Sequence, residues 1–268
     1  MIEPGWIIAY LILGSAVGFF AGLFGVGGGA IMVPALTTLF LLQDFPPEHI
    51  VHAALATSLA AIIVTSFSSL RAHHRHKAVI WTVVFSITPG ILVGTFGAAF
   101  IAAVISSRAL AIIFTCFMAY VSAQMLLNFK PSPARRLPGA AGLSLAGAGI
   151  GGISGLVAIG GGSMTVPFLT WCNVRIQRAI GTSAAVGFPI SVAGTLGYLV
   201  SGWGTEGMPE WSLGYVYLPA VVIISLVSYA TAPLGAGLAH RLPASVLRNL
   251  FAFLLILLCG KMLHSVFQ

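Results

Sequence analysis

The sequence predicts an all-α, polytopic membrane protein made of two inverted repeats, each a glycine-broken helical hairpin followed by three transmembrane helices. Three observations predict this fold: few charged residues, long apolar runs and a glycine-rich pattern that occurs twice. Only 6% of the 268 residues are charged, 58% are hydrophobic, and the mean hydropathy is +1.04. Soluble domains carry about 25% charged residues, so the composition excludes soluble enzymes and nucleic-acid-binding domains.

Apolar runs long enough to cross a bilayer fill most of the chain. A transmembrane helix needs about twenty predominantly apolar residues. The first and fifth runs are too long for a single crossing, and each has glycines near its middle. The eight runs cover residues 6–42, 50–70, 78–105, 109–128, 138–172, 179–201, 212–239 and 245–266.

The glycine pattern of the first run recurs in the fifth run without a gap, with Gly151 standing 133 residues after Gly18 (151 − 18). The residues that recur at this offset are Gly18, Gly22, Gly27, Gly28, Gly29, Val33, Pro34 and Leu36. A second echo pairs Thr57-Ser58 with Thr182-Ser183. We therefore divide the chain into a first membrane repeat at 1–130 and a second at 138–268, joined by a basic linker at 131–137.

The positions of Lys and Arg favour hairpins over single crossings in the first and fifth runs. Cytoplasmic loops of membrane proteins carry an excess of Lys and Arg, and the loops on both sides of the fifth run, 130–136 and 175–178, are basic. If both glycine-rich runs turn back, ten basic residues fall inside, two fall outside, and all five acidic residues fall outside. The ten are Arg71, Arg75, Lys77, Lys130, Arg135, Arg136, Arg175, Arg178, Arg241 and Arg248.

Each repeat then crosses the bilayer an odd number of times, so the two repeats have opposite orientations. Inverted repeats with helices broken near the midplane are typical of secondary transporters. After each glycine run a helix restarts, around residues 29–31 and 162–164, with Pro34 or Pro167 near its first turn, where proline is tolerated. The free N–H groups and positive dipole of a helix N-terminus bind anions. The sequence therefore predicts an anion site at the midplane between two restarted helices.

The expected substrate-binding residues are the central glycines and nearby hydroxyls: Gly27, Gly28, Gly29, Thr57, Ser58, Gly160, Gly161, Gly162, Ser163, Thr182 and Ser183. Ser163 and Thr165, just after the second glycine run, are further candidates for contact with the substrate. The alternative for Thr57-Ser58 and Thr182-Ser183 is a hydroxyl bond to the carbonyl four residues earlier, as is common in membrane helices. We expect Pro34 and Pro167 to be structural.

Basic clusters admit two interpretations. Arg175 and Arg178 either attract cytoplasmic anions as a vestibule or act only as topology determinants. The segment from Arg71 to Lys77 contains three histidines, but we interpret it as a cytoplasmic loop that contacts anionic lipid headgroups rather than as a metal site. The sequence indicates no metal, no cofactor and no nucleic-acid partner, and it does not predict the oligomeric state.

The doubled G-x-x-x-G…G-G-G-x-x-x-V-P-x-L pattern, followed by A-x-x-T-S, resembles the TauE/SafE family of sulfite and organosulfonate exporters. The resemblance implies a multi-pass permease of a bacterial-type inner membrane that moves small sulfur oxyanions such as sulfite, sulfoacetate or related organosulfonates. The motif residues carry over to Gly27, Gly28, Gly29, Pro34, Gly160, Gly161, Gly162 and Pro167. One departure is that Ala30 stands where the second copy has Ser163.

The leading hypothesis is an anion exporter that works by alternating access between the repeats. None of the predicted spans contains Asp or Glu, so the usual carboxylate proton relay is missing. An anion that leaves a negative cell interior gains about 2.3 kcal/mol per charge per 100 mV, so the membrane potential can drive export. An importer of sulfur-containing anions and an anion channel stay open as alternatives. A membrane enzyme is disfavoured because we find no nucleophile–base set at membrane depth.

Overall fold

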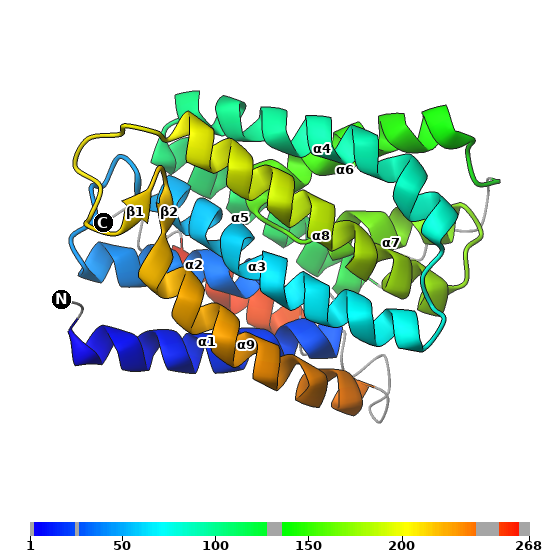
Figure 1. The fold of residues 1–268 in the computed structure, drawn as a ribbon, viewed down its shortest axis with the longest axis horizontal. Helices are drawn as coiled ribbons and strands as arrows, with labels where there is room; N and C mark the ends of the chain where they lie inside the picture. Colours follow the sequence, from blue (N-terminus) through cyan, green and yellow to red (C-terminus); the bar gives the residue numbers. More distant parts are fainter. Residues whose placement is uncertain (1–2, 25–26, 128–135, 240–251, 263–268) are drawn as a thin grey trace.

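The computed structural model describes residues 3–24, 27–127, 136–239 and 252–262 as a bundle of helices (Figure 1). A short antiparallel hairpin of β1 (Ser212–Leu213) and β2 (Val216–Tyr217) lies at one end. The labelled helices are α1 (Pro4–Phe24), α2 (Gly29–Leu42), α3 (Ile50–Arg75), α4 (Trp81–Val104), α5 (Ser107–Leu126), α6 (Ala140–Val157), α7 (Gly162–Trp171), α8 (Ile176–Ser201) and α9 (Leu218–Ala239). A further short helix covers Ala252–Met262.

Seven of the described helices are long and apolar enough to cross a membrane: α1, α3, α4, α5, α6, α8 and α9. Large apolar side chains also point away from the bundle, among them Val93, Val104 and Leu145, each about three quarters or more exposed. A soluble protein does not expose such a continuous apolar surface, whereas lipid covers it without cost. The predicted all-α, polytopic membrane protein is confirmed.

The first glycine-rich run forms a hairpin, with α2 returning to the end of the molecule where α1 begins (Figure 1). Tyr10, near the start of α1, donates a hydrogen bond of 3.0 Å to Oε1 of Gln43. Gln43 is the residue directly after the end of α2. Phe40 of α2 stacks on Phe45 at the same end, with ring centroids 4.2 Å apart. The two arms of the hairpin are therefore antiparallel.

The second glycine-rich run also returns to the end of the molecule from which it starts. Ser144 of α6 packs against Gly90 in the first half of α4, and Gly181 at the start of α8 packs against Ala78, just before α4. The start of α6 and the start of α8 consequently lie at the same end of the molecule, so α7 must return to that end (Figure 1).

The long arm of each hairpin packs on a helix from the other half of the chain. Rows of glycines allow this close approach: a Cβ atom on Gly18 would lie 2.5 Å from the Ser228 backbone of α9, and one on Gly151 would lie 2.7 Å from the Ile91 carbonyl of α4. Small residues let membrane helices approach backbone to backbone. These contacts pair α1 with α9 and α6 with α4. The opposite orientation of the two repeats and the division at 130 and 138 stay predictions.

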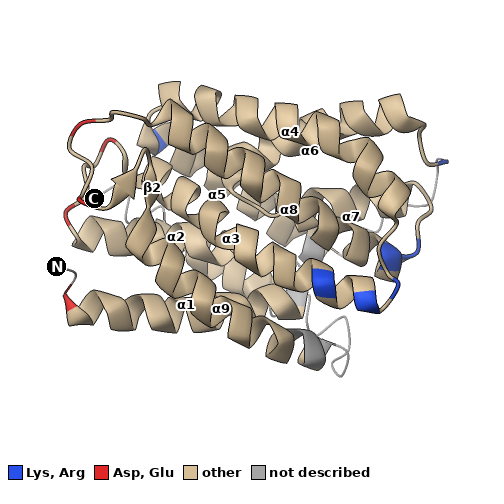
Figure 2. Ribbon diagram, in the orientation of Figure 1, with Lys and Arg blue, Asp and Glu red and all other residues tan. Residues whose placement is uncertain are grey.

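Charged residues are segregated between the two ends of the bundle (Figure 2). The acidic residues gather at the end that holds the α2–α3 and α8–α9 connections, and most of the described Lys and Arg residues gather at the opposite end. Ser107 Oγ donates to the Glu48 carbonyl at 2.7 Å, which places neighbouring Arg108 at the acidic end. The hairpin topology predicts this separation, but Lys130, Arg135, Arg241 and Arg248 lie outside the described residues. That the basic end faces the cytoplasm stays a prediction.

Two predicted boundaries are wrong. The histidine-rich segment that we expected as a loop is helical as far as Arg75, because no glycine or proline interrupts α3 before that residue. The seventh apolar run begins with the β-hairpin, and its helix starts only at Leu218. Gly214, at φ +55°, occupies the first position of the two-residue hairpin loop, where a type II′ turn favours glycine.

The hairpin topology predicts the sides from which single cysteines react. In a variant with its three native cysteines replaced by alanine, Gly139→Cys and Gln177→Cys, both exposed, should react with a membrane-impermeant maleimide from the same side. The exposed control Glu206→Cys should react from the other side only. Labelling of right-side-out and inside-out vesicles measures this, and reaction of positions 139 and 177 from opposite sides would contradict the hairpin.

Candidate functional site

Each glycine run breaks the helix at a left-handed glycine. Gly28, at φ +81°, is the N-cap of α2, and Gly161, at φ +77°, is the N-cap of α7. A left-handed conformation costs other residues about 1–2 kcal/mol, whereas glycine adopts it freely. The restarts at Gly29 and Gly162 confirm the predicted positions. We call residues 27–29 the first elbow and residues 158–162 the second elbow.

The prolines lie deeper in the restarted helices than predicted. Pro34 and Pro167 are each the sixth residue of their helix, not part of the first turn. Proline at this position has no N–H to donate to the carbonyl four residues earlier, which is that of Ala30 or Ser163. The first-turn explanation for these prolines is therefore wrong, and each one weakens the helix directly beside its elbow.

The two elbows contact each other backbone to backbone at the centre of the bundle. A Cβ atom on Gly27 would lie 3.0 Å from Gly160 Cα, and one on Gly29 would overlap the carbonyl oxygen of Ala158. The Gly160 carbonyl in turn lies against Gly187 of α8, where a Cβ would be 2.8 Å away. Because only hydrogens separate these main chains, the pattern of glycines in both copies has a direct steric reason.

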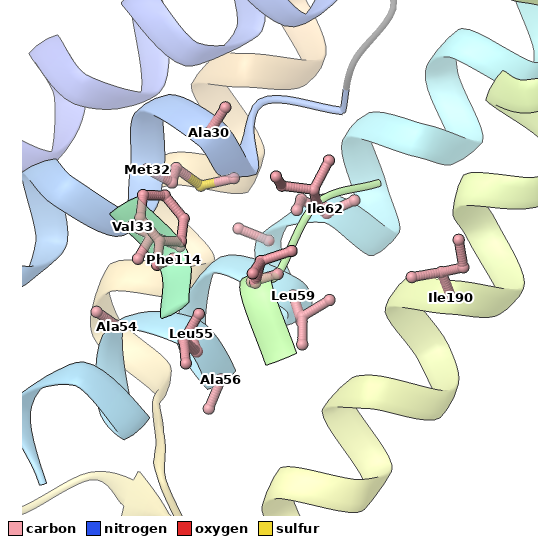
Figure 3. Close-up of a cluster of buried hydrophobic side chains, with 14 of the residues drawn as sticks. Ala30, Met32, Val33, Ala54, Leu55, Ala56, Leu59, Ile62, Phe114 and Ile190 are labelled. Atoms are coloured by element: carbon pink, nitrogen blue, oxygen red, sulfur yellow. The ribbon is translucent and has the colours of Figure 1, made fainter. Parts of the chain in front are cut away.

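The side chains around the elbows are apolar. A Cβ atom on Gly28 would lie 2.7 Å from Val17 Cγ1, and Ile62 of α3 contacts Gly27 and Gly29. Figure 3 shows Met32 extending toward Ile62 within a cluster of buried hydrophobic side chains. A charge or an unpaired polar group is costly in such surroundings, so electrostatic interactions at the elbows are strong.

The N-terminal amides of α2 and α7 lie within this apolar centre. The first intrahelical donors are the amides of Ile31 and Met164, which bond to the carbonyls of Gly28 and Gly161 at 3.1 and 3.2 Å. Within the described residues, no side chain caps either N-terminus. Each N-terminus therefore presents the earlier amides of its first turn, with the partial positive charge of the helix dipole.

The two threonines expected at the site accept hydrogen bonds from helix starts. Thr57 Oγ1 accepts from the Tyr217 amide at 3.1 Å, just before α9, and Thr182 Oγ1 accepts from the Ile80 amide at 3.0 Å, at the N-cap of α4. Both bonds supply a missing acceptor to a buried or half-buried amide. These hydroxyls therefore hold α9 and α4 in place, and their contact with a substrate stays a prediction.

The hydroxyls of Ser58 and Ser183, which directly follow these two threonines in the chain, make no hydrogen bond to a described residue. Both residues are 0% exposed, and neither Oγ has a hydrogen-bond partner among the described residues. Eight residues further along each helix, Ser66 bonds to the Ile63 carbonyl at 3.1 Å and Ser191 to the Phe188 carbonyl at 2.8 Å. Ser66 and Ser191 thus bond to a carbonyl of their own helix, three residues earlier. Ser58 and Ser183, which we predicted at the site, make no such local bond.

The other predicted residues divide between the centre and the basic end. Ser163 is buried at the second residue of α7, beside the second elbow. Arg175 and Arg178 are exposed at the start of α8, beyond the whole of α7, which at 1.5 Å per residue spans about 15 Å. The structure therefore does not bring the arginines to the elbows, and their role as a vestibule stays a prediction.

Sequence reasoning missed further buried hydroxyls, two of which lie on α4 and α9. Thr95 Oγ1 of α4 and Ser225 Oγ of α9 have no partner among the described residues, and a Cβ atom on Gly151 would lie 2.7 Å from Thr95 Oγ1. Their signal in the sequence is a single hydroxyl in an apolar helix, which is too common to single out a site.

Comparison with known proteins identifies the family. Residues 10–262 match the family described as Sulfite exporter TauE/SafE. The chain belongs to this family. The TauE/SafE chain is 37% identical over 262 residues to a probable membrane transporter protein of Haemophilus influenzae, covering 96% of this chain and 98% of the relative. It is 29% identical to a probable membrane transporter protein of Methanocaldococcus jannaschii, covering 91% of each chain. No solved structure matches it.

Family and relatives show that this TauE/SafE protein is a multi-pass membrane transporter. The match runs through both glycine elbows and through α3 and α8, which carry Ser58 and Ser183. The apolar centre with two bare helix N-termini is therefore the candidate site of a transport protein.

A bulky residue at an elbow should disrupt this centre. Gly161→Leu forces a side chain into a left-handed conformation and toward Ile190 Cδ1, 2.9 Å from the Cβ position. Strain of about 1–2 kcal/mol and overpacking of about 1–3 kcal/mol should lower the melting temperature and abolish transport in proteoliposomes. Gly149→Leu in α6, where nothing lies within 4 Å of a Cβ, is the control. Equal melting temperatures for the two variants would contradict the close packing of the elbows.

Proposed function

We propose that the protein exports small sulfur-containing anions, such as sulfite, sulfoacetate or related organosulfonates, by alternating access. The anion binds beside the contacting elbows, to first-turn amides of α2 and α7 and to the hydroxyls of Ser58, Ser163 and Ser183. The observation that carries the proposal is the pair Ser58 and Ser183, which stand at equivalent places in the two copies, fully buried and without a hydrogen-bond partner in the part of the chain that the structure describes.

Buried hydroxyls without partners need a physical explanation. An unsatisfied buried polar group costs about 1–3 kcal/mol, and most such groups in proteins are hydrogen-bonded. A hydroxyl that waits for a ligand has this property, because it donates only when the ligand is present. Two such donors at repeat-equivalent positions support a ligand shared by both halves of the chain.

The chemistry of the centre supports an anion as that ligand. Helix N-termini and hydroxyls offer donors, and a small oxyanion accepts several hydrogen bonds at once. Neutral donors bind the anion without a fixed positive charge, so release does not require breaking a buried ion pair. Such a site suits a transporter, which must bind its substrate and let it go.

Alternating access fits the way in which the elbows are enclosed. Gly28, Gly29 and Gly160 to Gly162 are buried, so an anion reaches them only when neighbouring helices separate. We propose that α1 with α9 and α6 with α4 move as pairs, because each pair is packed backbone to backbone. The membrane potential of about 2.3 kcal/mol per charge per 100 mV then favours outward movement of the anion.

Removing the two site serines should weaken anion binding without destabilising the empty protein. Ser58→Ala and Ser183→Ala delete hydroxyls that make no hydrogen bond in the structure, so the melting temperature without ligand should stay equal or rise. A hydrogen bond to a charged group contributes about 1.5–3 kcal/mol, so each variant should raise the Kd for sulfite about ten- to a hundredfold. Titration calorimetry on purified protein measures this.

The matched controls are Ser66→Ala and Ser191→Ala, which remove the locally bonded serines of the same two helices. These variants should leave the Kd for sulfite within about threefold of the wild type. Equal losses of affinity in both pairs would sink the assignment of Ser58 and Ser183. Wild-type protein that binds neither sulfite nor sulfoacetate would sink the proposed substrate class.

A further inference from the structure

The two elbows differ chemically at one position. In α7, Thr165 lies on the first turn after Gly161, and in α2 the residue at the same place after Gly28 is Met32. Both side chains face their own elbow: a Cβ atom on Gly161 would lie 3.4 Å from Thr165 Oγ1, and one on Gly28 would lie 3.7 Å from Met32 Cε. The second elbow is thus lined by a hydroxyl, where the first is lined by a methyl group.

Thr165 does not use its hydroxyl as other threonines of the restarted helices do. Thr37 bonds to the Val33 carbonyl at 2.8 Å, and Thr170 bonds to the Val166 carbonyl at 2.9 Å. Thr165 is 0% exposed, yet its Oγ1 has no hydrogen-bond partner among the described residues. The carbonyl to which it would bond, that of Gly161, already accepts the amides of Met164 and Thr165 itself.

The hydroxyl of α3 that corresponds by the repeat to the Gly161-contacting residue of α8 is engaged elsewhere. On α3, Thr65 stands at the repeat position of Ile190, which contacts Gly161. The Thr65 hydroxyl bonds to the Ala61 carbonyl at 3.1 Å and lies 3.2 Å from Ser228 Oγ. Beside Gly28 the closest groups are instead Val17, Ala21 and Met32, all apolar. The second elbow therefore has an unused hydroxyl donor, that of Thr165, next to its N-cap Gly161. At the same place the first elbow has the apolar side chain of Met32.

From these contrasts we infer that the second elbow binds the anion directly, with Thr165 Oγ1 donating to one of its oxygens beside the first-turn amides of α7, and that the first elbow forms an apolar wall closed by Met32. This inference rests on the proposed function, and it makes the site asymmetric. A hydroxyl and helix amides converge from one side, so a single negatively charged group is held there while the remainder of the ligand contacts the methionine side.

The asymmetric site assigns different roles to two repeat-equivalent residues. Thr165 is a ligand of the anion, so its hydroxyl, and not its volume, sets affinity. Met32 is a packing residue, so its volume and apolar character matter, and a similar apolar side chain replaces it. If both elbows bound the anion equally, substitutions of Thr165 and of Met32 would instead change the affinity equally.

The test compares three variants by titration of purified protein with sulfite. Thr165→Val keeps the shape of the side chain and removes the donor, and it should raise the Kd about tenfold or more. Thr165→Ser keeps the donor and should stay within about threefold of the wild type, as should Met32→Leu, the control at the equivalent position. The melting temperature of Thr165→Val without ligand should equal that of the wild type or exceed it, because the deleted hydroxyl has no hydrogen-bond partner among the residues that the structure describes.

Each outcome decides a separate point. If Thr165→Val binds sulfite as the wild type does, or if Thr165→Ser loses as much affinity as Thr165→Val, the hydroxyl is not a ligand and the inference fails while the proposed function stands. An equal loss in Met32→Leu contradicts the asymmetry. Wild-type protein without saturable sulfite binding contradicts the proposed function itself, and the inference falls with it.

Discussion

Backbone-to-backbone contact between the two elbows is the constraint on which the rest of the structure depends. Gly29 lies against the Ala158 carbonyl, and Gly27 lies against Gly160, so no side chain fits between the elbows. This contact places two helix N-termini at the centre of a membrane protein, where a free amide has no water to bond. The hairpins, the pairing of their long arms across the halves and the buried hydroxyls are all arranged around it.

Binding without charged side chains is the chemical consequence of that arrangement. The described residues that contact the elbows are apolar or carry hydroxyls, and the Lys and Arg residues gather mostly at one distant end (Figure 2). Helix dipoles, hydroxyls and the backbone groups of the elbows then provide the polarity at the centre. In a medium of low dielectric constant this modest polarity has a large effect, which lets a transporter bind an anion and still release it.

Much of this organisation could be predicted from residue patterns, because they reflect simple sterics. The repeated glycines predicted the breaks at Gly28 and Gly161, and basic loops on both sides of the fifth run predicted that it turns back. The predicted end of α3 was wrong because the charged last turn of a helix resembles a loop in composition. The depth of Pro34 was missed because the restart was predicted only as the range 29–31, and a helix that begins at Gly29, the first residue of that range, has Pro34 as its sixth residue.

The hydroxyls show the limit of sequence reasoning at the site. Thr57 and Ser58 are neighbours and looked equivalent, yet a helix directs them to different sides. The Thr57 hydroxyl accepts a hydrogen bond from the Tyr217 amide, and the Ser58 hydroxyl has no partner within the described parts of the chain. Which hydroxyl is engaged depends on the placement of α9 and α4, and therefore on tertiary structure. The contrast between Thr165 and Met32 is visible in the sequence, but its meaning depends on the unbonded hydroxyl.

Anomalous diffraction from crystals soaked in selenite, a heavier analogue of sulfite, would show directly whether an anion binds at the elbows. We expect a selenium peak at the centre of the bundle, beside the contacting elbows and within hydrogen-bond reach of the first-turn amides of α7. A peak confined to the basic end, at Arg175 and Arg178, with none at the elbows would contradict it.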